Sequence, residues 1–371
     1  MIRYLSTSLK QTPLSKIQQQ LGPVLGNFAG YNMPMKFNYN SVKDVVTGVR
    51  NGVGIFDVSH MGYIKLSSDN ISNINRLLEK VFPINTDTIK YNESKLSILL
   101  NNKGYIQDDL IIGNVNNHFR LIVNASNKYE ILTLLQNYNL QNKTDVNISL
   151  KDKVILAIQG PKSQPLLNNI LQTDLSDLFF NQNRKINCNL EISRTGYTGE
   201  DGFELYFDPE SGEKFYKLLI NYQKTQNDMY FGGLIERDIL RLEAGLCLSG
   251  NEFGDNMEIS FPDLNMNFLI GKKRRNNGDF IGYDKMVTDS EFIRTGFISK
   301  KPVRPNDLIY NHFKHNVGFI TSSNKSYNLN KFISMGYVRK DNLKNIYIIN
   351  KDKQIILEQT NLPFIPHNLY K

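Results

Sequence analysis

The pattern of apolar and polar positions predicts that strands and helices mix through the first two-thirds of the chain. Val154–Ile158 is continuously apolar and is followed by a Gly-Pro pair, which is typical of a buried strand that ends in a turn. Asp109–Val115 and His118–Asn124 predict the two strands of a hairpin, because the asparagine pair Asn116-Asn117 between them is a turn signal. This part of the chain is therefore expected to be α+β.

Three segments carry apolar residues at helical spacing. Ser163 is expected to cap the first, whose apolar face is Leu166, Leu167, Ile170 and Leu171. Asp208-Pro209 is expected to open the second, whose stripe is Phe215, Leu218, Leu219 and Tyr222. The third segment has its stripe at Ile235, Ile239, Leu242 and Leu246.

After Gly282 the chain becomes strand-like, with short apolar runs separated by turn residues. The clearest runs are Phe297-Ile298, Val317–Ile320, Met335–Val338 and Ile346–Ile349. Several short strands of this kind predict a small β-barrel at the C-terminal end.

Composition places the chain in the ordinary globular class. Its 371 residues suffice for two or three domains, and 40% are hydrophobic and 22% charged. No apolar run is long enough to cross a bilayer, so a membrane-spanning protein is not expected. The two cysteines, Cys188 and Cys247, imply no disulfide framework and fit reduced thiols.

The net charge of +8 raises the question of nucleic acid. The only dense basic cluster is the run of Lys272, Lys273, Arg274 and Arg275. Elsewhere the two signs are interspersed, and no zinc-knuckle or RNP-like pattern occurs, so a nucleic-acid partner is not expected. A basic patch for an acidic protein partner fits better, and a solvated surface is the plain alternative.

Residues 1–11 have the character of a mitochondrial transit peptide. The first ten contain Arg3, Lys10, three Ser or Thr hydroxyls and no acid. We expect this segment to lie outside the fold; a short N-terminus without structure is the alternative.

Arg194–Phe207 reads RTGYTGEDGFELYF and has a glycine at every third position of its first half. Such glycines permit sharp bends and close approach to a ligand. In the run that follows, Phe203, Leu205 and Phe207 are expected on one face and Glu204 and Tyr206 on the other. Alone, this pattern fits a ligand loop or a tight loop that enters a half-buried strand with a solvated acid.

Four further motifs accompany this loop. They are FDVSHMG at 56–62, GYIQDDL at 104–110, AIQGP at 157–161 and RDILRLEAGLCL at 237–248. In this order and spacing, the five motifs resemble the glycine cleavage system T-protein, the tetrahydrofolate-dependent aminomethyltransferase of mitochondrial type. The resemblance runs from about Thr12 to the C-terminal PFIPHNLY and is strongest up to about Gly250.

The resemblance implies a cloverleaf of three domains around a central folate cavity. A discontinuous folate-binding domain is expected at 12–65 and 152–262. An α/β domain is expected to be inserted at 66–151. A linker and the C-terminal β-barrel domain are expected to occupy 263–371.

The resemblance also implies the reaction and its participants. The enzyme takes the aminomethyl group from the lipoyl arm of H-protein and passes its methylene carbon to tetrahydrofolate, a co-substrate, with release of ammonia. This system is mitochondrial in eukaryotes, so the matrix is the expected compartment. The alternative is a folate-binding relative without enzymatic activity that assists iron–sulfur cluster assembly, but its KGCYxGQE-type signature is absent.

The resemblance assigns Asp109, the second acid of DDL, to the reaction. A fixed carboxylate can hold the folate amines and stabilise positive charge as it develops on the methylene carbon. Asp108 precedes it on the same predicted strand, and adjacent residues point to opposite faces, so only one of the two is expected to serve the site. A solvated turn pair is the alternative for these acids.

Four residues are expected at the folate: Glu204, Arg237, Met61 and Tyr197. A surface arginine that pairs with nearby acids is the alternative for Arg237, and a core tyrosine is the alternative for Tyr197. Glu204 can accept two hydrogen bonds from the N–H edge of a pterin. Arg237 follows Glu236, where the family usually has a small residue, so the local charge differs. Leu96 stands where many members of the family have a tyrosine, so this chain lacks one possible folate contact.

Other polar residues are expected to be structural. His60 has no nucleophile or acid arranged with it, and Arg241 is expected to form a structural ion pair. The histidines show no ligand-like spacing with Cys or acids, so no metal is expected. The basic run 272–275 is expected to dock the acidic H-protein.

Overall fold

Strands from two distant parts of the chain form one six-stranded sheet. The computed structural model describes residues 8–115, 118–254, 257–276, 278–351 and 353–371, and the sheet order is β10-β11-β12-β9-β3-β13. β13 pairs with β3 in parallel and the other neighbours are antiparallel. The strands are β3 (Val53–Asp57), β9 (Val154–Gln159), β10 (Asn183–Asn187), β11 (Leu190–Ser193), β12 (Gly202–Phe207) and β13 (Met229–Gly232).

A five-stranded antiparallel sheet, in the order β5-β6-β7-β4-β8, lies between β3 and β9 in the sequence. Its strands are β4 (Gly62–Ser67), β5 (Ser94–Leu100), β6 (Ile106–Val115), β7 (His118–Val123) and β8 (Asn147–Lys151). Helices α3 (Ile71–Val81) and α4 (Lys128–Asn142) pack on it and share its apolar core. β6 and β7 pair as the predicted hairpin; its turn, residues 116–117, lies outside the described residues.

The central strand β12 keeps the predicted alternation but is buried on both faces. Phe203, Leu205 and Phe207 belong to one core, and Tyr206 belongs to another. Glu204 is only 8% exposed. The alternative of a half-buried strand with a solvated acid is therefore wrong, because the five-stranded sheet covers the second face.

Three helices follow the predicted stripes with local differences. They are α5 (Ser163–Leu171), α6 (Pro209–Gln223) and α7 (Leu234–Glu243). Ser163 does not cap α5: it is the first helical residue, and its hydroxyl is buried without a partner among the described residues. Leu218 is exposed and Leu246 lies beyond the end of α7, so neither extends its stripe as predicted.

The C-terminal third forms a closed six-stranded barrel, as predicted, in the order β14-β17-β16-β15-β18-β19. The strands are β14 (Phe292–Ser299), β15 (Leu308–Tyr310), β16 (Asn316–Ser326), β17 (Lys331–Arg339), β18 (Ile346–Asn350) and β19 (Lys353–Thr360). Helix α7 contacts β16 and β17 and so joins the barrel to the six-stranded sheet.

Short elements connect these lobes. Near the N-terminus these are α1 (Ser15–Gln18), η1 (Gln19–Leu21), β1 (Pro23–Phe28), β2 (Tyr31–Phe37) and α2 (Val42–Asn51). Elsewhere they are η2 (Thr86–Thr88), α8 (Phe261–Leu264), η3 (Asn267–Leu269), α9 (Lys272–Asn276) and η4 (Tyr283–Lys285). Lys10, inside the predicted transit segment, bridges to Tyr31 of β2, whereas residues 1–7 lie outside the described residues.

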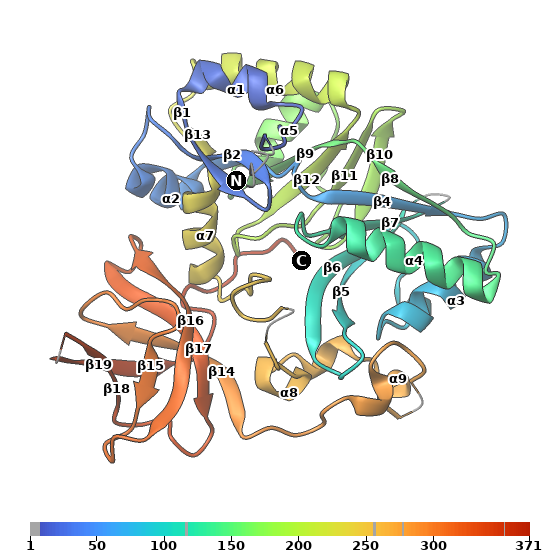
Figure 1. Cartoon of the computed structure of the whole chain (residues 1–371). Helices are drawn as coiled ribbons and strands as arrows, with labels where there is room; N and C mark the ends of the chain where they lie inside the picture. Colours follow the sequence, from blue (N-terminus) through green and yellow to red (C-terminus); the bar gives the residue numbers. More distant parts are fainter. Residues whose placement is uncertain (1–7, 116–117, 255–256, 277, 352) are drawn as a thin grey trace, which may run out of the picture.

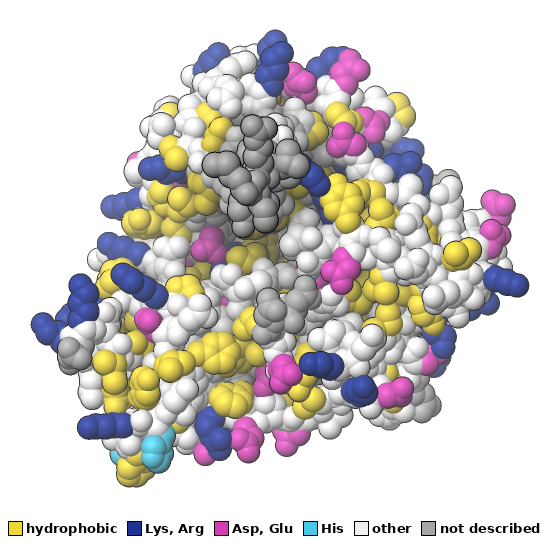
Figure 2. All heavy atoms as spheres, in the orientation of Figure 1, with side chains coloured by type: hydrophobic (Ala, Val, Ile, Leu, Met, Phe, Trp, Pro, Cys, Tyr) yellow, Lys and Arg dark blue, Asp and Glu magenta, His cyan; other side chains and the backbone are white. Residues whose placement is uncertain are grey.

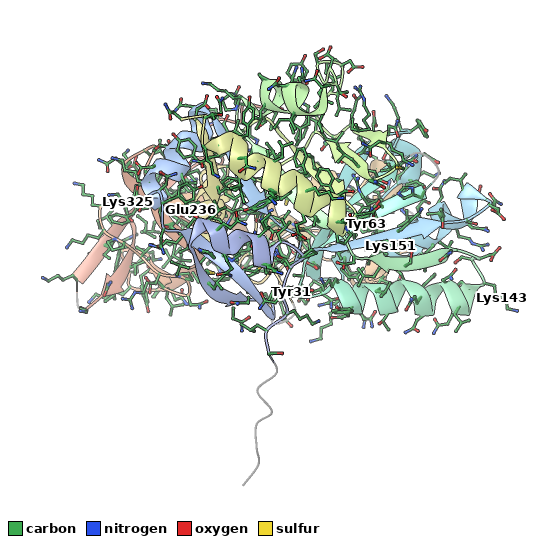
Figure 3. The ribbon with its side chains drawn as sticks, turned by 90° about the horizontal axis from the view of Figure 1, so that it is seen from above. Tyr31, Tyr63, Lys143, Lys151, Glu236 and Lys325 are labelled. Atoms are coloured by element: carbon green, nitrogen blue, oxygen red, sulfur yellow. The ribbon has the colours of Figure 1, made fainter. Side chains whose placement is uncertain are left out.

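The three lobes surround a common centre, where the C-terminus also lies (Figure 1). Seen from above, Lys325 of the barrel and Lys143, the residue after α4, lie at opposite sides (Figure 3). Charges of both signs are interspersed around the rim of the face shown in Figure 2. Among the described residues, no helix combines the length and apolar character needed to cross a membrane.

The sheets divide the chain close to the predicted domain limits. The chain passes from the first sheet to the second between Asp57 and Gly62, so the predicted boundary at 65/66 falls inside β4. It returns to the first sheet after β8, which ends at Lys151. The assignment of functions to these lobes stays a prediction.

Candidate active site

Two adjacent carboxylates on β6 bind one amide. The Asn124 Nδ2 donates to Asp108 Oδ1 at 2.7 Å and to Asp109 Oδ1 at 2.8 Å. Asp108 is fully buried and also accepts from the Asp109 backbone N–H at 3.0 Å. The expectation that the strand separates the two acids is therefore incomplete, because Asp108 folds back and both carboxylates reach Asn124.

This arrangement makes Asp109 hard to ionise. Burial raises its pKa to about 7, and the charge of Asp108 contributes to the rise. Burial also raises the pKa of Asp108. A carboxylate with its pKa near neutrality, next to a second acid, is typical of a reactive position.

One carboxylate oxygen of Glu204 accepts a hydrogen bond from a neighbouring side chain. The Tyr206 hydroxyl donates to Glu204 Oε2 at 2.7 Å. The guanidinium of Arg120, a fully buried residue of β7, lies 4.0 Å from the centre of the Tyr206 ring. The five-stranded sheet therefore positions Glu204 through Tyr206, and this hydrogen bond occupies only Oε2.

Arg237 connects the remaining predicted residues. Its guanidinium lies 4.5 Å from the centre of the Tyr197 ring. Burial lowers the pKa of Arg237, while Tyr197, Glu204 and Asp109 oppose this shift electrostatically. The Tyr197 hydroxyl in turn donates to the carbonyl oxygen of Cys247. Asp109 of β6, Glu204 of β12 and Tyr197 of the glycine-rich loop, residues 194–202, thus all interact electrostatically with Arg237 of α7.

Glu236 does not place a free charge beside this group. Its carboxylate accepts from the Gly233 backbone N–H at 2.8 Å and completes the N-terminal cap of α7. Glu236, which replaces the small residue usual in the family, therefore acts as part of the N-terminal cap of α7.

His60 and Met61 border the same region. His60 is buried, and burial, together with the charges of Arg237 and Lys128, lowers its pKa to about 3, so its ring is neutral. Its edge meets Phe28 at 5.4 Å between ring centres. Met61 packs against the core shared by the two sheets. The Nδ1 of His60 is buried without a hydrogen-bond partner among the described residues, and the structural role expected for His60 stays a prediction.

Buried ion pairs surround the site. Arg194 binds Asp201 at 2.6 Å, and Arg50 binds Glu200 at 3.0 Å and Glu243 at 2.7 Å. Arg241 pairs with Glu252 at 2.9 Å, which confirms its structural role. Sequence reasoning did not identify Arg50, Arg120 or Asn124, because no motif distinguishes them from ordinary polar residues.

The basic run 272–275 is only partly exposed. Lys272, Lys273 and Arg275 lie at the surface of α9, whereas Arg274 is buried. Arg274 pairs with Asp279 at 3.1 Å and also donates to the Glu79 carbonyl oxygen. The expectation of four docking cations is therefore wrong for Arg274, which anchors α9 to α3.

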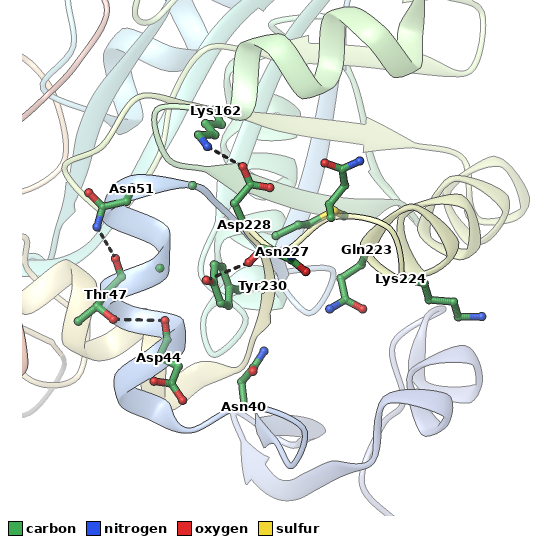
Figure 4. A pocket seen from close by; sticks show the side chains of 14 residues that line it. Asn40, Asp44, Thr47, Asn51, Lys162, Gln223, Lys224, Asn227, Asp228 and Tyr230 are labelled. Carbon is green, nitrogen blue, oxygen red and sulfur yellow. Dashed lines mark hydrogen bonds and ion pairs between the residues drawn. The ribbon is translucent and has the colours of Figure 1, made fainter.

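A polar cleft of about 760 Å³ lies elsewhere, beside α2 and β13 (Figure 4). Its lining includes the ion pair between Lys162 and Asp228, at 2.7 Å, and the ring of Tyr230. None of the predicted site residues lines it. No group of three or more His, Cys, Asp or Glu with the arrangement of a metal site occurs within the described ranges.

The fold and this partly buried group of acids, arginine and tyrosine define an α+β protein with a barrel and an internal polar site. Two family descriptions match the chain: the GCVT N-terminal domain over residues 14–274 and the glycine cleavage T-protein C-terminal barrel domain over 294–365. The chain belongs to the glycine cleavage T-protein family.

Individual relatives agree with this assignment. The mitochondrial aminomethyltransferase of Pisum sativum is 34% identical over 98% of this chain and 91% of its own. An aminomethyltransferase of Staphylococcus epidermidis is 31% identical over 91% and 92%. The crystal structure of the glycine cleavage system aminomethyltransferase T from Bartonella henselae has a TM-score of 0.90 and 27% identity, covering 98% of this chain and all of that one. These matches confirm the predicted family, fold and enzyme class.

Proposed function

We propose that the group around Asp109 and Arg237 transfers the methylene carbon of an aminomethyl-lipoyl arm to tetrahydrofolate and releases ammonia. The carrying observation is the convergence of Asp109, Glu204, Arg237 and Tyr197 from separate elements. Aminomethyl transfer is the activity named for the relatives, and nothing observed favours the iron–sulfur alternative.

Asp109 is proposed to stabilise the cationic character of the methylene carbon as the amine leaves. Its carboxylate is fixed by Asn124, so it needs little reorganisation when charge develops. A pKa near 7 also places it within reach of a proton transfer at neutral pH. Charge stabilisation requires the carboxylate form, so the pH dependence of the rate shows whether ionised Asp109 is the active form.

The folate is proposed to bind through Glu204, Arg237, Tyr197 and Met61. Glu204 can accept from the N–H edge of the pterin through Oε1, because Tyr206 occupies only Oε2. Arg237 and Tyr197 offer a stacked cationic and aromatic surface. Met61 adds an apolar wall. No metal ion is part of this proposal.

The proposed partner is a lipoyl-carrying H-protein, and the proposed docking cations are Lys272, Lys273 and Arg275, which are exposed. The proposed compartment is the mitochondrial matrix, and the plant relatives are named as mitochondrial proteins. Lys10 pairs with Tyr31 of β2. Cleavage of the transit peptide before Lys10 would therefore keep this pairing.

Tetrahydrofolate-dependent release of ammonia from aminomethylated H-protein tests the proposal. The wild-type protein should release ammonia only when both substrates are present. Asp109→Asn should reduce the rate by about a hundredfold or more, as for loss of a fixed charge-stabilising group. An exposed acid, Asp87, provides a matched Asp→Asn control that should keep the rate. Ammonia release by Asp109→Asn at the wild-type rate would contradict the assignment.

A further inference from the structure

The C-terminal tail, residues 361–371, leaves the barrel after β19 and returns to the six-stranded sheet (Figure 1). On its way it crosses the end of α7. The Ile365 backbone N–H donates to the Glu243 carbonyl at 3.0 Å, and His367 Nε2 donates to the Ala244 carbonyl at 2.9 Å. The tail is therefore attached to the helix that carries Arg237.

The tail then binds the glycine-rich loop, residues 194–202. The Asn368 backbone N–H donates to the Gly199 carbonyl at 2.7 Å, and the two segments form a bridge between Glu200 and Asn368. Gly199 has a left-handed backbone (φ 79°), and a β-carbon there would lie 3.1 Å from the His367 ring. The loop conformation and the tail thus fit each other closely, which a side chain at Gly199 would prevent.

Tyr370 fixes the other end of the loop. Its ring lies 3.7 Å from the guanidinium carbon of Arg194, the first residue of the loop, and stacks on Phe179. Its hydroxyl donates to the Ser176 carbonyl at 3.0 Å. Arg194 is itself fully buried and paired with Asp201. The tail therefore contacts the loop at Arg194 and at Gly199, on both sides of Tyr197.

We infer that the tail is a positioning element for the folate site, with Asn368 and Tyr370 as its positioning residues. Tyr197 lies between the two contact points in the sequence, and the guanidinium of Arg237 packs on its ring. Glu204 lies on β12, which directly follows the loop. Because the tail begins in the barrel, it also couples the position of the barrel to the geometry of this loop. The inference rests on the proposed function, and it assigns the tail an effect on folate affinity rather than on the chemical step.

Two pairs of variants test the inference. Asn368→Pro removes the backbone donor to Gly199. Asn368→Ala keeps that donor and loses only the long hydrogen bond from Asn368 Nδ2 to Glu200 Oε2, at 3.3 Å, so it is the matched control. Tyr370→Ala removes the ring beside Arg194, whereas Tyr370→Phe keeps the ring and loses only the hydroxyl. A truncation that ends at Pro366 removes both attachments at once. All are made in the full chain apart from that truncation.

The readouts are the KM of each substrate, kcat, and the Kd of tetrahydrofolate by titration. Asn368→Pro and Tyr370→Ala should each raise the KM and Kd for tetrahydrofolate about tenfold, the cost of about one lost hydrogen bond or ring contact. The KM for aminomethylated H-protein should stay at the wild-type value, and Asn368→Ala and Tyr370→Phe should stay within about twofold. A purely structural role would lower the melting temperature without this selective change.

Unchanged folate affinity in Asn368→Pro and Tyr370→Ala would overturn the inference, as would an equal rise in both KM values. If the truncated chain does not fold, the point variants decide. The proposed function is tested separately, because its failure would appear in the wild-type protein as absent tetrahydrofolate binding or absent ammonia release.

Discussion

Replacement of Asp108 by asparagine should shift the pH dependence of methylene transfer to lower pH. Both carboxylates bind Asn124 Nδ2, at 2.7 and 2.8 Å. The two bound oxygens therefore lie no more than about 5.5 Å apart, the sum of these distances. At that separation and an effective dielectric constant of about 20, two unit charges repel by about 3 kcal/mol. This corresponds to about two pH units in the pKa of Asp109.

The sign follows from the direction of the shift. Burial and the Asp108 charge raise the pKa of Asp109 to about 7, so its ionised form is disfavoured in the folded protein. If the carboxylate is the active form, the rate of the wild-type protein rises with pH through about 7. Asp108→Asn removes the neighbouring charge, and solvent and nearby cations weaken the repulsion. We therefore expect the midpoint to move down by about one to two pH units.

The same substitution should change stability with pH. When folding raises the pKa of a carboxyl group, the free energy of unfolding falls as pH rises from the unfolded pKa of that group, about 4, to its folded pKa. Asp108→Asn should therefore lose less stability than wild type between these limits, as thermal melts at both ends of the range would show.

The assay for the midpoint is single-turnover ammonia release with saturating substrates, measured on both sides of the wild-type midpoint and of the expected variant midpoint. Under these conditions, binding and product release do not mask the chemical step. Asp87→Asn, at an exposed acid, should leave the midpoint unchanged. An unshifted midpoint in Asp108→Asn would refute the reasoning, and so would a rate that falls as pH rises through 7, because the protonated acid would then be the active form.

Further outcomes are expected for variants in β12 and in the basic run 272–275. Glu204→Ala should weaken tetrahydrofolate binding in a titration, whereas Leu205→Ala, on the buried core face, should chiefly lower the free energy of unfolding by about 2–5 kcal/mol. Tyr206→Phe should weaken folate binding by about 1 kcal/mol, because Glu204 Oε2 loses its donor; unaltered affinity would argue against that positioning. Arg274→Gln should lower the melting temperature. By contrast, the salt dependence of the KM for H-protein should fall, without loss of folate affinity, when glutamine replaces Lys272, Lys273 and Arg275.

Much of the fold follows from local sequence patterns. The alternation in β12, the hairpin of β6 and β7 and the barrel strands were predicted because a strand repeats every two residues and turn residues mark its ends. The series of five motifs predicted the family, which the comparisons confirm. The helix ends were less well predicted, since Ser163 begins α5 instead of capping it.

The environment of the predicted site residues depended on contacts that are distant in the sequence. Local alternation placed Asp108 and Asp109 on opposite faces, yet the amide of Asn124, the residue after the neighbouring strand β7, binds both. Arg120 reaches Tyr206 from another sheet, and no pattern around either residue indicates this. Adjacent strands and packed sheets set these distances, so the residues' own neighbours in the sequence carry no information about them.

The sequence by itself determined the class of fold and the order of its parts, and it predicted which residues act in the site. Only the tertiary structure decided which of those side chains are buried and what holds them. Arg274 and Lys273 are adjacent basic residues, but α9 turns one toward α3 and the other to solvent. The C-terminal tail meets the glycine-rich loop only because the barrel returns it to the first sheet. The physical reason is that periodicity fixes the direction of a side chain within its element, whereas burial, pKa and partners depend on how elements pack.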